Sequence, residues 1–339
     1  MNRFKAHSRF TGLFPVALAV LLFVGTACRQ EPPKPAGPPE KITFAYPTTM
    51  LSILPHIACE KGYFLAEGLA VTPQFHEFGK PALQSVLEGK ADLAVSADTP
   101  VMFAVTGGKK IYLAAVVATS VKTMAVVARK DRGISLPADL RGKRIGVTPG
   151  TTGDFYLASL LSVTGIDGKN VKIIDMTPGE MPDAIARGSV DAVSVWEPDL
   201  KRIERELKDN GVSFYDEHLY SDTACISAQQ DFTRKHPETI RKALKALARA
   251  EAFVKQNPGE AKRIIAEFTR MDKSAIEELW NLYDFRVVLT QSLLVSLEDQ
   301  TRWAVKNRLT QCRYMPNYLD FIYIEGLHAV KPEAVRIIR

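Results

Sequence analysis

Short apolar or β-branched runs alternate with segments of helical spacing along residues 41–195. Such runs predict strands, and their alternation with helices predicts parallel sheets covered by helices on both faces, which is an α/β architecture. The runs lie at residues 42–46, 71–75, 93–95, 111–118, 124–128, 145–147, 171–174 and 192–195. In such sheets ligands bind at the carboxyl ends of the strands, where the loops converge.

The last part of the chain, residues 231–339, has a mostly helical pattern. Apolar stripes next to charged faces predict amphipathic helices at 241–254, 258–268, 273–282 and 297–307. The charge runs in this part are typical of solvated helix faces rather than of binding sites.

Two segments repeat one plan. Residues 78–100 and 177–198 each contain a Gly or Pro turn, a short amphipathic helix, Gly-x-x-Asp, an apolar strand and an acid-containing loop that ends in proline. Asp98 and Glu197 occupy matching places after the two strands. The roughly 300 residues that follow the N-terminal region are enough for two compact lobes. We therefore interpret the repeat as one structural unit that is used once in each lobe.

The sequence TPGTTGD lies where a predicted strand at 145–147 turns into a predicted helix. The first turn of a helix has backbone N–H groups without partners and a positive potential, so such a junction can hold an anion. Threonine at a helix start also caps the helix, which contributes roughly 1 kcal/mol of stability. The local sequence favours capping by Thr151 or Thr152, and it leaves ligand binding open.

The N-terminus has the layout of a secretory signal. Three basic residues and no acid precede an apolar segment at 13–24, which is short for a membrane span and ends in small residues. Cys28 follows directly and resembles the lipidated cysteine of bacterial lipoproteins, although Gly25 stands where leucine is usual. We expect a signal peptide at 1–27, lipidation of Cys28 and a proline-rich tether at 28–40, since such a segment favours an extended chain.

Charge and cysteine content exclude some classes of function. The formal charge of +6 falls to about +3 without the three basic residues of 1–27, which is too little to indicate nucleic-acid binding. Cys59, Cys225 and Cys312 leave one disulfide open, and neither they nor the six histidines have the spacing of a metal site. We predict no metal and no cofactor.

Several stretches together resemble the periplasmic substrate-binding proteins of ABC importers for nitrate, sulfonates, taurine and thiamine-pyrimidine precursors. They are CEKGYFLAEGLAVTPQF, LEGKADLAVSADTP, ADLRGKRIGVTPGTTGDFYL, ARGSVDAVSVWEP and TQSLLVSLEDQTRWA. The resemblance implies a type II periplasmic-binding-protein fold, with two α/β lobes, a ligand cleft between them and a helical C-terminal extension. Carried onto this chain, lobe one comprises residues 41–129 plus 224–339, and lobe two comprises 130–223.

The resemblance also implies which loops line the cleft, and it raises the expectation that TPGTTGD contacts a ligand. The predicted ligand-binding residues are Tyr46, Ser52, Gly79, Lys80, Asp98, Thr99, Ser120, Thr151, Thr152, Gly153, Trp196 and Glu197. Asp98 and Glu197 either cap the helices that follow them or receive a cationic group of the ligand. Tyr46 and Trp196 either stack on a ring or pack beneath a loop.

We expect an extracytoplasmic lipoprotein, anchored on the periplasmic or cell-surface side, that captures a small anionic or zwitterionic solute for an ABC importer. The solute classes are sulfonates such as taurine and pyrimidine precursors. The expected partners are the permease with its ATPase, and the protein is expected to be a monomer. A ligand-binding sensor and a pyrimidine-synthase-like enzyme are the alternatives. The chain has no G-x-S-x-G, P-loop or H-E-x-x-H motif, and we predict no enzyme activity.

Overall fold

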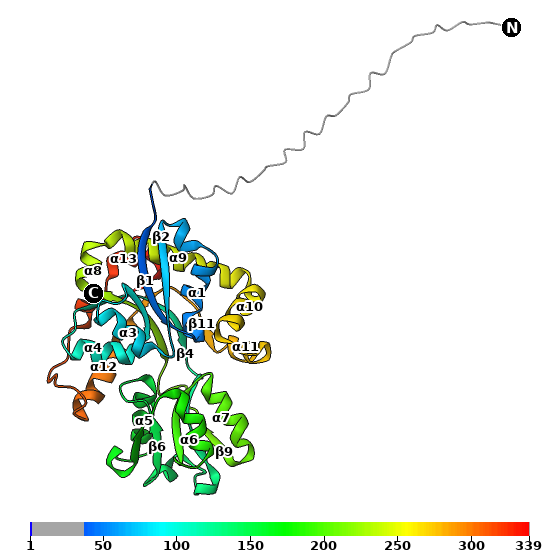
Figure 1. Cartoon of the computed structure of the whole chain (residues 1–339), viewed down its shortest axis with the longest axis vertical. Coiled ribbons are helices and arrows are strands. Elements are labelled where there is room, and N and C mark those ends of the chain that lie inside the picture. Colours follow the sequence, from blue (N-terminus) through cyan, green and yellow to red (C-terminus); the bar gives the residue numbers. More distant parts are fainter. Residues whose placement is uncertain (2–36, 339) are drawn as a thin grey trace. The chain divides into compact units, whose positions relative to one another are not determined.

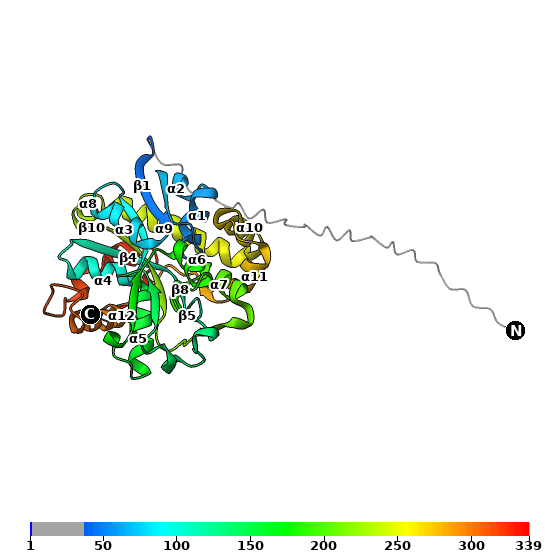
Figure 2. The ribbon, with the colours of Figure 1, turned by 60° about the horizontal axis from the view of Figure 1, so that its bottom comes forward.

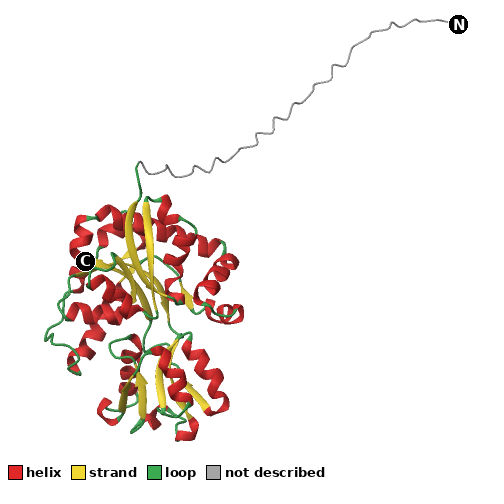
Figure 3. Cartoon of the chain, viewed as in Figure 1, coloured by secondary structure: helices red, strands yellow, loops and turns green. Residues whose placement is uncertain are grey.

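A computed structural model describes residue 1 and residues 37–338, and its strands form two main sheets (Figures 1 and 3). The first sheet has the order β11-β4-β10-β3-β1-β2. Its strands are β1 Glu40–Pro47, β2 Leu69–His76, β3 Leu93–Ala97, β4 Ile111–Ser120, β10 Asp222–Gln229 and β11 Tyr283–Asp284. Strand β1 runs parallel to β2 and β3, whereas β10 runs antiparallel to both of its neighbours, β3 and β4.

The second sheet has the order β7-β6-β8-β5-β9. Its strands are β5 Met124–Arg129, β6 Arg144–Val147, β7 Lys172–Asp175, β8 Ala192–Trp196 and β9 Gly211–Phe214. Strand β6 is parallel to β7 and β8, and β5 is antiparallel to β8 and β9. The α/β class expected from the sequence is confirmed, but the sheets are mixed rather than parallel, because the strand that enters each sheet after a crossover runs against its neighbours.

The chain passes between the sheets twice, at residues 121–123 and at 215–221. The expected first boundary, after residue 129, differs from this arrangement, because β5 already pairs within the second sheet. The expected second boundary, after residue 223, lies just inside β10. Both differences have one cause: an apolar run predicts a strand without indicating which sheet it joins. We call the first sheet with its helices the first lobe and the second sheet with its helices the second lobe.

Helices cover the sheets. In the first lobe they are α1 Ile53–Glu60, α2 Tyr63–Ala66, α3 Gly79–Leu87, α4 Asp98–Thr106, α8 Gln230–Lys235, α9 Pro237–Gln256, α10 Pro258–Thr269, α11 Lys273–Trp280, α12 Gln291–Lys306 and α13 Ile324–His328. Helix α9 contributes Leu244 and Leu247 to the same core as Phe44 of β1. Figure 2 shows the helices of this lobe around its sheet. The C-terminal helices are therefore part of the first lobe's core.

The second lobe has α5 Thr152–Val163, α6 Met181–Ala186 and α7 Asp199–Leu207. Alternate residues of β5 enter different cores: Val126 packs with residues of α5, and Val127 packs with residues of α6 and α7. Both faces of this sheet are therefore buried, which explains why β5 is apolar from Met124 to Ala128.

Short elements complete the described fold. Strands β12 Leu289–Thr290 and β13 Val335–Arg336 form a two-stranded sheet. The 3-10 helices are Met50–Ser52, Lys130–Arg132, Pro137–Leu140, Gly168–Asn170, Pro178–Glu180, Lys208–Asn210, Tyr318–Phe321 and Pro332–Ala334. No helix within 37–338 combines the length and apolarity needed to cross a membrane. The predicted signal peptide, Cys28 and the tether up to residue 36 lie outside the described residues.

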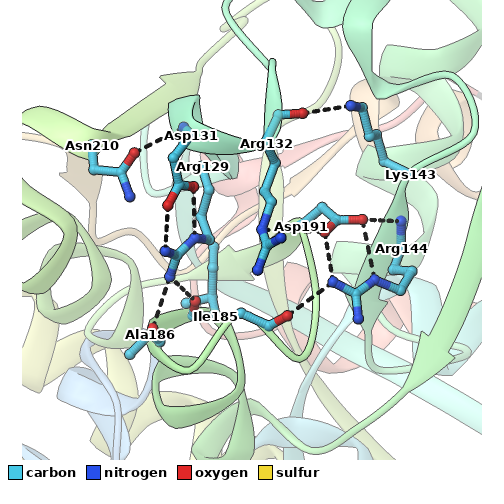
Figure 4. Close-up of polar contacts among 10 residues, drawn as sticks. Arg129, Asp131, Arg132, Lys143, Arg144, Ile185, Ala186, Asp191 and Asn210 are labelled. Carbon is cyan, nitrogen blue, oxygen red and sulfur yellow. Dashed lines mark hydrogen bonds and ion pairs between the residues drawn. The ribbon is translucent and has the colours of Figure 1, made fainter.

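The Gly-x-x-Asp repeat has the same structure in both lobes. The N–H of Asp92 donates to the carbonyl of Thr43 at 2.9 Å, and Oδ2 of Asp92 accepts from the N–H of Thr43 at 2.7 Å. Asp191 makes the same two bonds with Arg144, at 2.8 and 2.9 Å, and it also pairs with the guanidinium of Arg144 (Figure 4). The glycine three residues earlier has φ of 70° in one lobe and 72° in the other, which favours glycine. Each aspartate thus fastens its strand to the neighbouring strand.

Candidate functional site

A cavity lies between residues of the two lobes, and its empty space is about 450 Å³ with the mouth included. The part of this space that the centres of water molecules can occupy is much smaller, about 30 Å³. The lining residues are Pro47, Thr49, Leu51, Phe78, Gly79, Lys80, Val95, Ser96, Ala97, Pro100 and Asp222 from the first lobe, and Thr151, Thr152 and Trp196 from the second. Most of them follow the carboxyl ends of strands, where α/β sheets hold their ligands.

The loop TPGTTGD contributes its two threonines to the cavity wall. Neither acts as the cap that the local sequence favoured: the hydroxyl of Thr151 donates to the carbonyl of Thr148 at 2.7 Å. Asp154 supports the loop instead, because its Oδ2 accepts from the N–H of Gly150 at 2.9 Å. At the start of α5, the N–H groups of Asp154 and Phe155 donate to the carbonyl of Thr151 at 3.1 and 3.2 Å. The N–H groups of Thr152 and Gly153, the first two residues of the helix, have no earlier helical carbonyl to receive them.

Two further helices begin at the same cavity. Gly79 is the first residue of α3, and Ala97 precedes the first residue of α4. Gly79 is required by packing, since a Cβ there would lie 2.9 Å from Cα of Ser96. The N-terminal ends of α3, α4 and α5 therefore give the cavity a positive potential that favours an anionic group.

Three polar atoms of the wall have no hydrogen-bond partner: Oγ1 of Thr49, Oγ of Ser96 and Oδ1 of Asp222. Ser96 is only 1% exposed and Asp222 only 6%, so water does not solvate these side chains freely. Buried polar groups are nearly always paired in folded proteins. Their gathering in one cavity indicates a polar ligand.

Sequence reasoning missed Asp222. It is the first residue of β10, directly after the second crossover, and the one signal in the sequence is an acid at the start of a strand that has no other charged residue. Burial raises the pKa of its carboxyl to about 7, and the neighbouring Asp98 carboxylate adds to the rise. Of the lining residues Lys80 carries a positive charge, but its Nζ donates to the carbonyl of Pro149 at 2.7 Å.

An aromatic pair closes one side of the cavity. The rings of Phe78 and Trp196 come from different lobes, with centroids 6.3 Å apart and planes inclined by 56°. Neither ring is fully buried. The two rings together offer a ligand a continuous apolar surface.

The sequence matches a family model along more than half of its length. The model is described as NMT1/THI5 like, and it matches residues 54–261. The chain belongs to the NMT1/THI5-like family.

Named relatives and a solved structure agree with this family. A Brucella abortus relative, whose provisional name is that of a binding protein, is 28% identical over 227 residues, which are 65% of this chain and 69% of the relative. The taurine-binding periplasmic protein of Escherichia coli is 26% identical over 220 residues, which are 64% of this chain and 67% of the relative. The alkanesulfonate-binding protein SsuA of Xanthomonas axonopodis pv. citri, bound to MOPS, has a TM-score of 0.74 at 16% identity, over 85% of this chain and 99% of its own. The expected periplasmic-binding-protein fold is confirmed.

The same fold also occurs in an enzyme. The desulfurization enzyme DSZB has a TM-score of 0.65 at 14% identity, over 87% of this chain and 99% of its own. The fold of an NMT1/THI5-like chain therefore does not by itself separate binding from catalysis.

Five of the twelve predicted site residues line the cavity of this NMT1/THI5-like chain: Gly79, Lys80, Thr151, Thr152 and Trp196. Tyr46, Ser52, Asp98, Thr99, Ser120, Gly153 and Glu197 do not. Tyr46 is fully buried beside Phe44 and Phe75, and its hydroxyl lies 3.8 Å from Sγ of Cys59. It therefore packs in the core, which was the second of its two interpretations.

Asp98 has its oxygens occupied by protein donors. The hydroxyl of Tyr220 donates to Oδ1, and Oδ2 accepts from Oγ of Ser296 at 2.7 Å and from Nε2 of Gln300 at 2.8 Å. Burial nevertheless raises its pKa to about 6, against the effect of these bonds. Asp98 is thus a buried connection between α4, the second crossover and α12, with no acceptor left for a ligand.

Glu197 follows the capping interpretation. Its Oε2 accepts from the N–H of Lys201 at 3.2 Å, in the first turn of α7, and burial raises its pKa to about 7. Its Oε1 has no partner, but Glu197 is not among the residues that line the cavity.

The remaining predicted residues support the wall from behind. Gly153 allows α5 to approach β8, because a Cβ there would lie 3.1 Å from both the carbonyl of Ser194 and the ring of Trp196. Ser120 hydrogen-bonds Thr123 across the first crossover. Ser52 and Thr99 are fully buried at the starts of α1 and α4.

No cysteine of the described residues lines the cavity. Cys59, Cys225 and Cys312 are free thiols, so the disulfide left open by the sequence does not form among them. Within the described part of the chain, no group of His, Cys, Asp and Glu side chains is arranged to hold a metal ion.

Proposed function

We propose that this protein is the extracytoplasmic solute-binding component of an ABC importer, and that its cavity holds a small organic solute with an acidic group. The observation that carries the proposal is the meeting of three helix N-termini with the unpartnered Ser96 hydroxyl in one cavity. The names of the relatives support the solute class, since they include taurine-binding and alkanesulfonate-binding proteins.

The energetics of such a site are sufficient for capture at micromolar concentration. Hydrogen bonds to a charged group contribute about 1.5–3 kcal/mol each, and micromolar affinity requires about 8 kcal/mol. Three or four such bonds from the helix starts and the hydroxyls, together with contact on Phe78 and Trp196, supply this amount.

Capture requires the lobes to close on the solute, and contacts between them support a closed form. Oε1 of Glu77 accepts from the N–H of Gly179 at 3.0 Å, and Nζ of Lys201 lies 2.8 Å from Oε1 of Glu278. These bonds are peripheral to the cavity and exposed, so each contributes little by itself. A solute that bridges both walls adds the differential affinity that favours closure.

The experiment is a thermal-shift screen of the mature protein with taurine, alkanesulfonates, nitrate, bicarbonate and aminopyrimidines. A solute that binds only the folded state raises stability by about 2.7 kcal/mol at a hundredfold excess over its Kd. We expect a shift with at least one organic anion and none with the same anion after Ser96→Val. The absence of a shift with every compound would remove the proposal.

We also propose that Cys28 is lipidated after cleavage of residues 1–27 and holds the protein on the outer side of a membrane. The sequence layout supports this, with Gly25 as its one departure from the usual pattern. Intact mass of the membrane-extracted protein tests it: the expected mass is that of a chain starting at a diacylated cysteine. Cys28→Ser should release the protein into the soluble fraction, and an unaltered membrane fraction would contradict the anchor.

A further inference from the structure

The carboxyl of Asp222 is the one acidic group in the wall of a cavity that otherwise favours anions. Its Oδ1 has no hydrogen-bond partner, and no ion pair among residues 37–338 includes it. Asp98, which lies next to it, is instead fully bonded to protein donors. Asp222 thus brings to the cavity wall a buried acceptor that protein groups leave unsatisfied.

The surroundings of Asp222 do not neutralise it. The groups that interact electrostatically with Asp222 are Asp98 on α4, Tyr220 on the second crossover, Cys225 on β10 and Tyr283 on β11. Glu197, which follows β8, interacts in turn with Tyr283. All of them are acids. Lys80 shares the cavity but donates to Pro149.

The backbone of Thr223 hydrogen-bonds the Asp222 carboxyl, but Oδ1 stays without a partner. A buried carboxyl oxygen without a partner is unfavourable, and two outcomes relieve it: the carboxyl keeps a proton, or a donor arrives with the ligand. Ser96 and Thr49 line the same cavity with unpartnered hydroxyls, which can accept or donate. A ligand nitrogen that bears N–H bonds would satisfy Asp222 while the acidic group of the same molecule occupies the helix starts. The cavity thus has complementary groups for both ends of an amino-bearing anion.

We propose that Asp222 accepts the N–H donors of a ligand nitrogen and thereby selects solutes with an amino group over the same solutes without one. This inference rests on the proposed function, since it assigns the solute class of the same site. The nitrogen has two chemical sources, an aliphatic ammonium group or an amino group on a ring, and both present the same donors.

Matched ligand pairs test the selection by isothermal titration of the mature protein. One pair is taurine with ethanesulfonate, and the other is 4-amino-2-methylpyrimidine with 2-methylpyrimidine. In the wild type we expect the amino member of at least one pair to bind 10-fold or more tightly than its partner. For an ammonium ligand, part of the protonated Asp222 should release its proton on binding, so the measured heat should depend on the ionisation enthalpy of the buffer.

Three variants assign the preference to a residue and a nitrogen type. Asp222→Leu removes charge and acceptor, so the preference should fall below 2-fold. Asp222→Asn keeps an acceptor without charge, so it should abolish a preference for ammonium and retain one for a neutral ring amine. Glu197→Gln changes the other carboxyl that has one unpartnered oxygen; it lies outside the wall, and the variant should retain the preference.

The outcomes separate this inference from the function on which it rests. Three results would overturn the role of Asp222: equal binding of both members of each pair, a preference that survives Asp222→Leu, or a preference that is lost only in Glu197→Gln. In each of these cases the proposed function as a solute-binding protein would still stand. If none of these probes nor any screened anion binds, the proposed function fails, and the inference fails with it. Circular dichroism and the melting temperature of each variant establish that it is folded.

Discussion

The ammonium group of Lys80 donates a hydrogen bond to the carbonyl oxygen of Pro149, with Nζ and O 2.7 Å apart. Lys80 is the second residue of α3 in the first lobe, and Pro149 precedes α5 in the second. Because both helices begin at the cavity, this bond fixes one wall of the site against the other.

Loss of this bond should weaken solute capture. Lys80→Met keeps the aliphatic stem and removes the donor, and we expect Kd to rise about 3- to 10-fold, since an exposed charged bond contributes roughly 0.5–1.5 kcal/mol. Titration calorimetry with the solute found by the screen measures the change. Lys90→Met is the matched control, because Lys90 follows the same helix and, within residues 37–338, forms an ion pair with Glu88 alone on the surface. Equal affinities of the two variants would show that the bond does not contribute to capture.

A proline at the start of α5 should remove one anion-binding donor and leave the fold intact. Thr152 is the first helical residue, where proline is tolerated, and Thr151 before it is extended with φ −119° and ψ 175°, as a residue before proline requires. Thr152→Pro deletes the N–H that faces the cavity, so Kd for an anionic solute should rise about 10- to 100-fold.

Two controls accompany that variant. Thr152→Ala keeps the N–H and tests the hydroxyl alone. Lys273→Pro places proline at the corresponding position of α11, which also follows an extended residue and is remote from the cavity. Affinity that is unchanged in Thr152→Pro would exclude this amide from the site.

The close approach of α3 to β3 should make Gly79 irreplaceable. A Cβ at Gly79 would lie 2.9 Å from Cα of Ser96 and 3.2 Å from the nitrogen of Ala97, and these backbone atoms have little room to move. Gly79→Ala should therefore lower the free energy of unfolding by about 1–3 kcal/mol and weaken solute binding, because the helix start shifts. Urea unfolding measures the first effect and calorimetry the second.

Gly259→Ala is the matched control for this substitution. Gly259 is the second residue of α10, and a Cβ there would meet no atom within 4 Å. Alanine should therefore be neutral or stabilise the protein by up to about 1 kcal/mol. A similar loss of stability in both variants would show that contact with Ser96 is not the cause.

The pattern of the sequence predicts the elements of this fold better than it predicts their connections. Each predicted apolar run up to residue 195 lies in a strand, because these runs are long and apolar enough to be recognised locally. Strands β9 and β10, which come later in the chain, were not predicted. The sheet that a strand joins depends on distant partners: β5 follows β4 after three residues, yet it pairs with β8 and β9. The mixed sheets and the position of the first boundary follow from such pairing, which no local pattern contains.

The same limit applies to the site. Gly79 and Thr152 could be predicted because each lies in a loop between a strand and a helix, where sequence motifs are informative. Asp98 and Glu197 occupy equivalent places in the repeat, but the packing of α12 and α7 decides that they serve the protein itself. Asp222 lies outside any repeat or motif, and only the fold brings it to the cavity.

The buried carboxyl of Asp222 should make the solute-free protein less stable as pH rises. Its pKa in the folded protein is about 7, above the ordinary value of 3.8, so between these values the folded state binds more protons than the unfolded state. Stability from this group is complete below about pH 4 and is lost as pH rises through 7.

The variant Asp222→Asn removes this titration. Between pH 5 and pH 8, the free energy of unfolding of the wild type should therefore decline by roughly 2 kcal/mol more than that of the variant. Asp98 and Glu197 also have raised pKa values, but they are present in both proteins and largely cancel in the difference. Urea unfolding at intervals of half a pH unit measures the two curves, and parallel curves would mean that Asp222 is either paired or solvated in the folded protein.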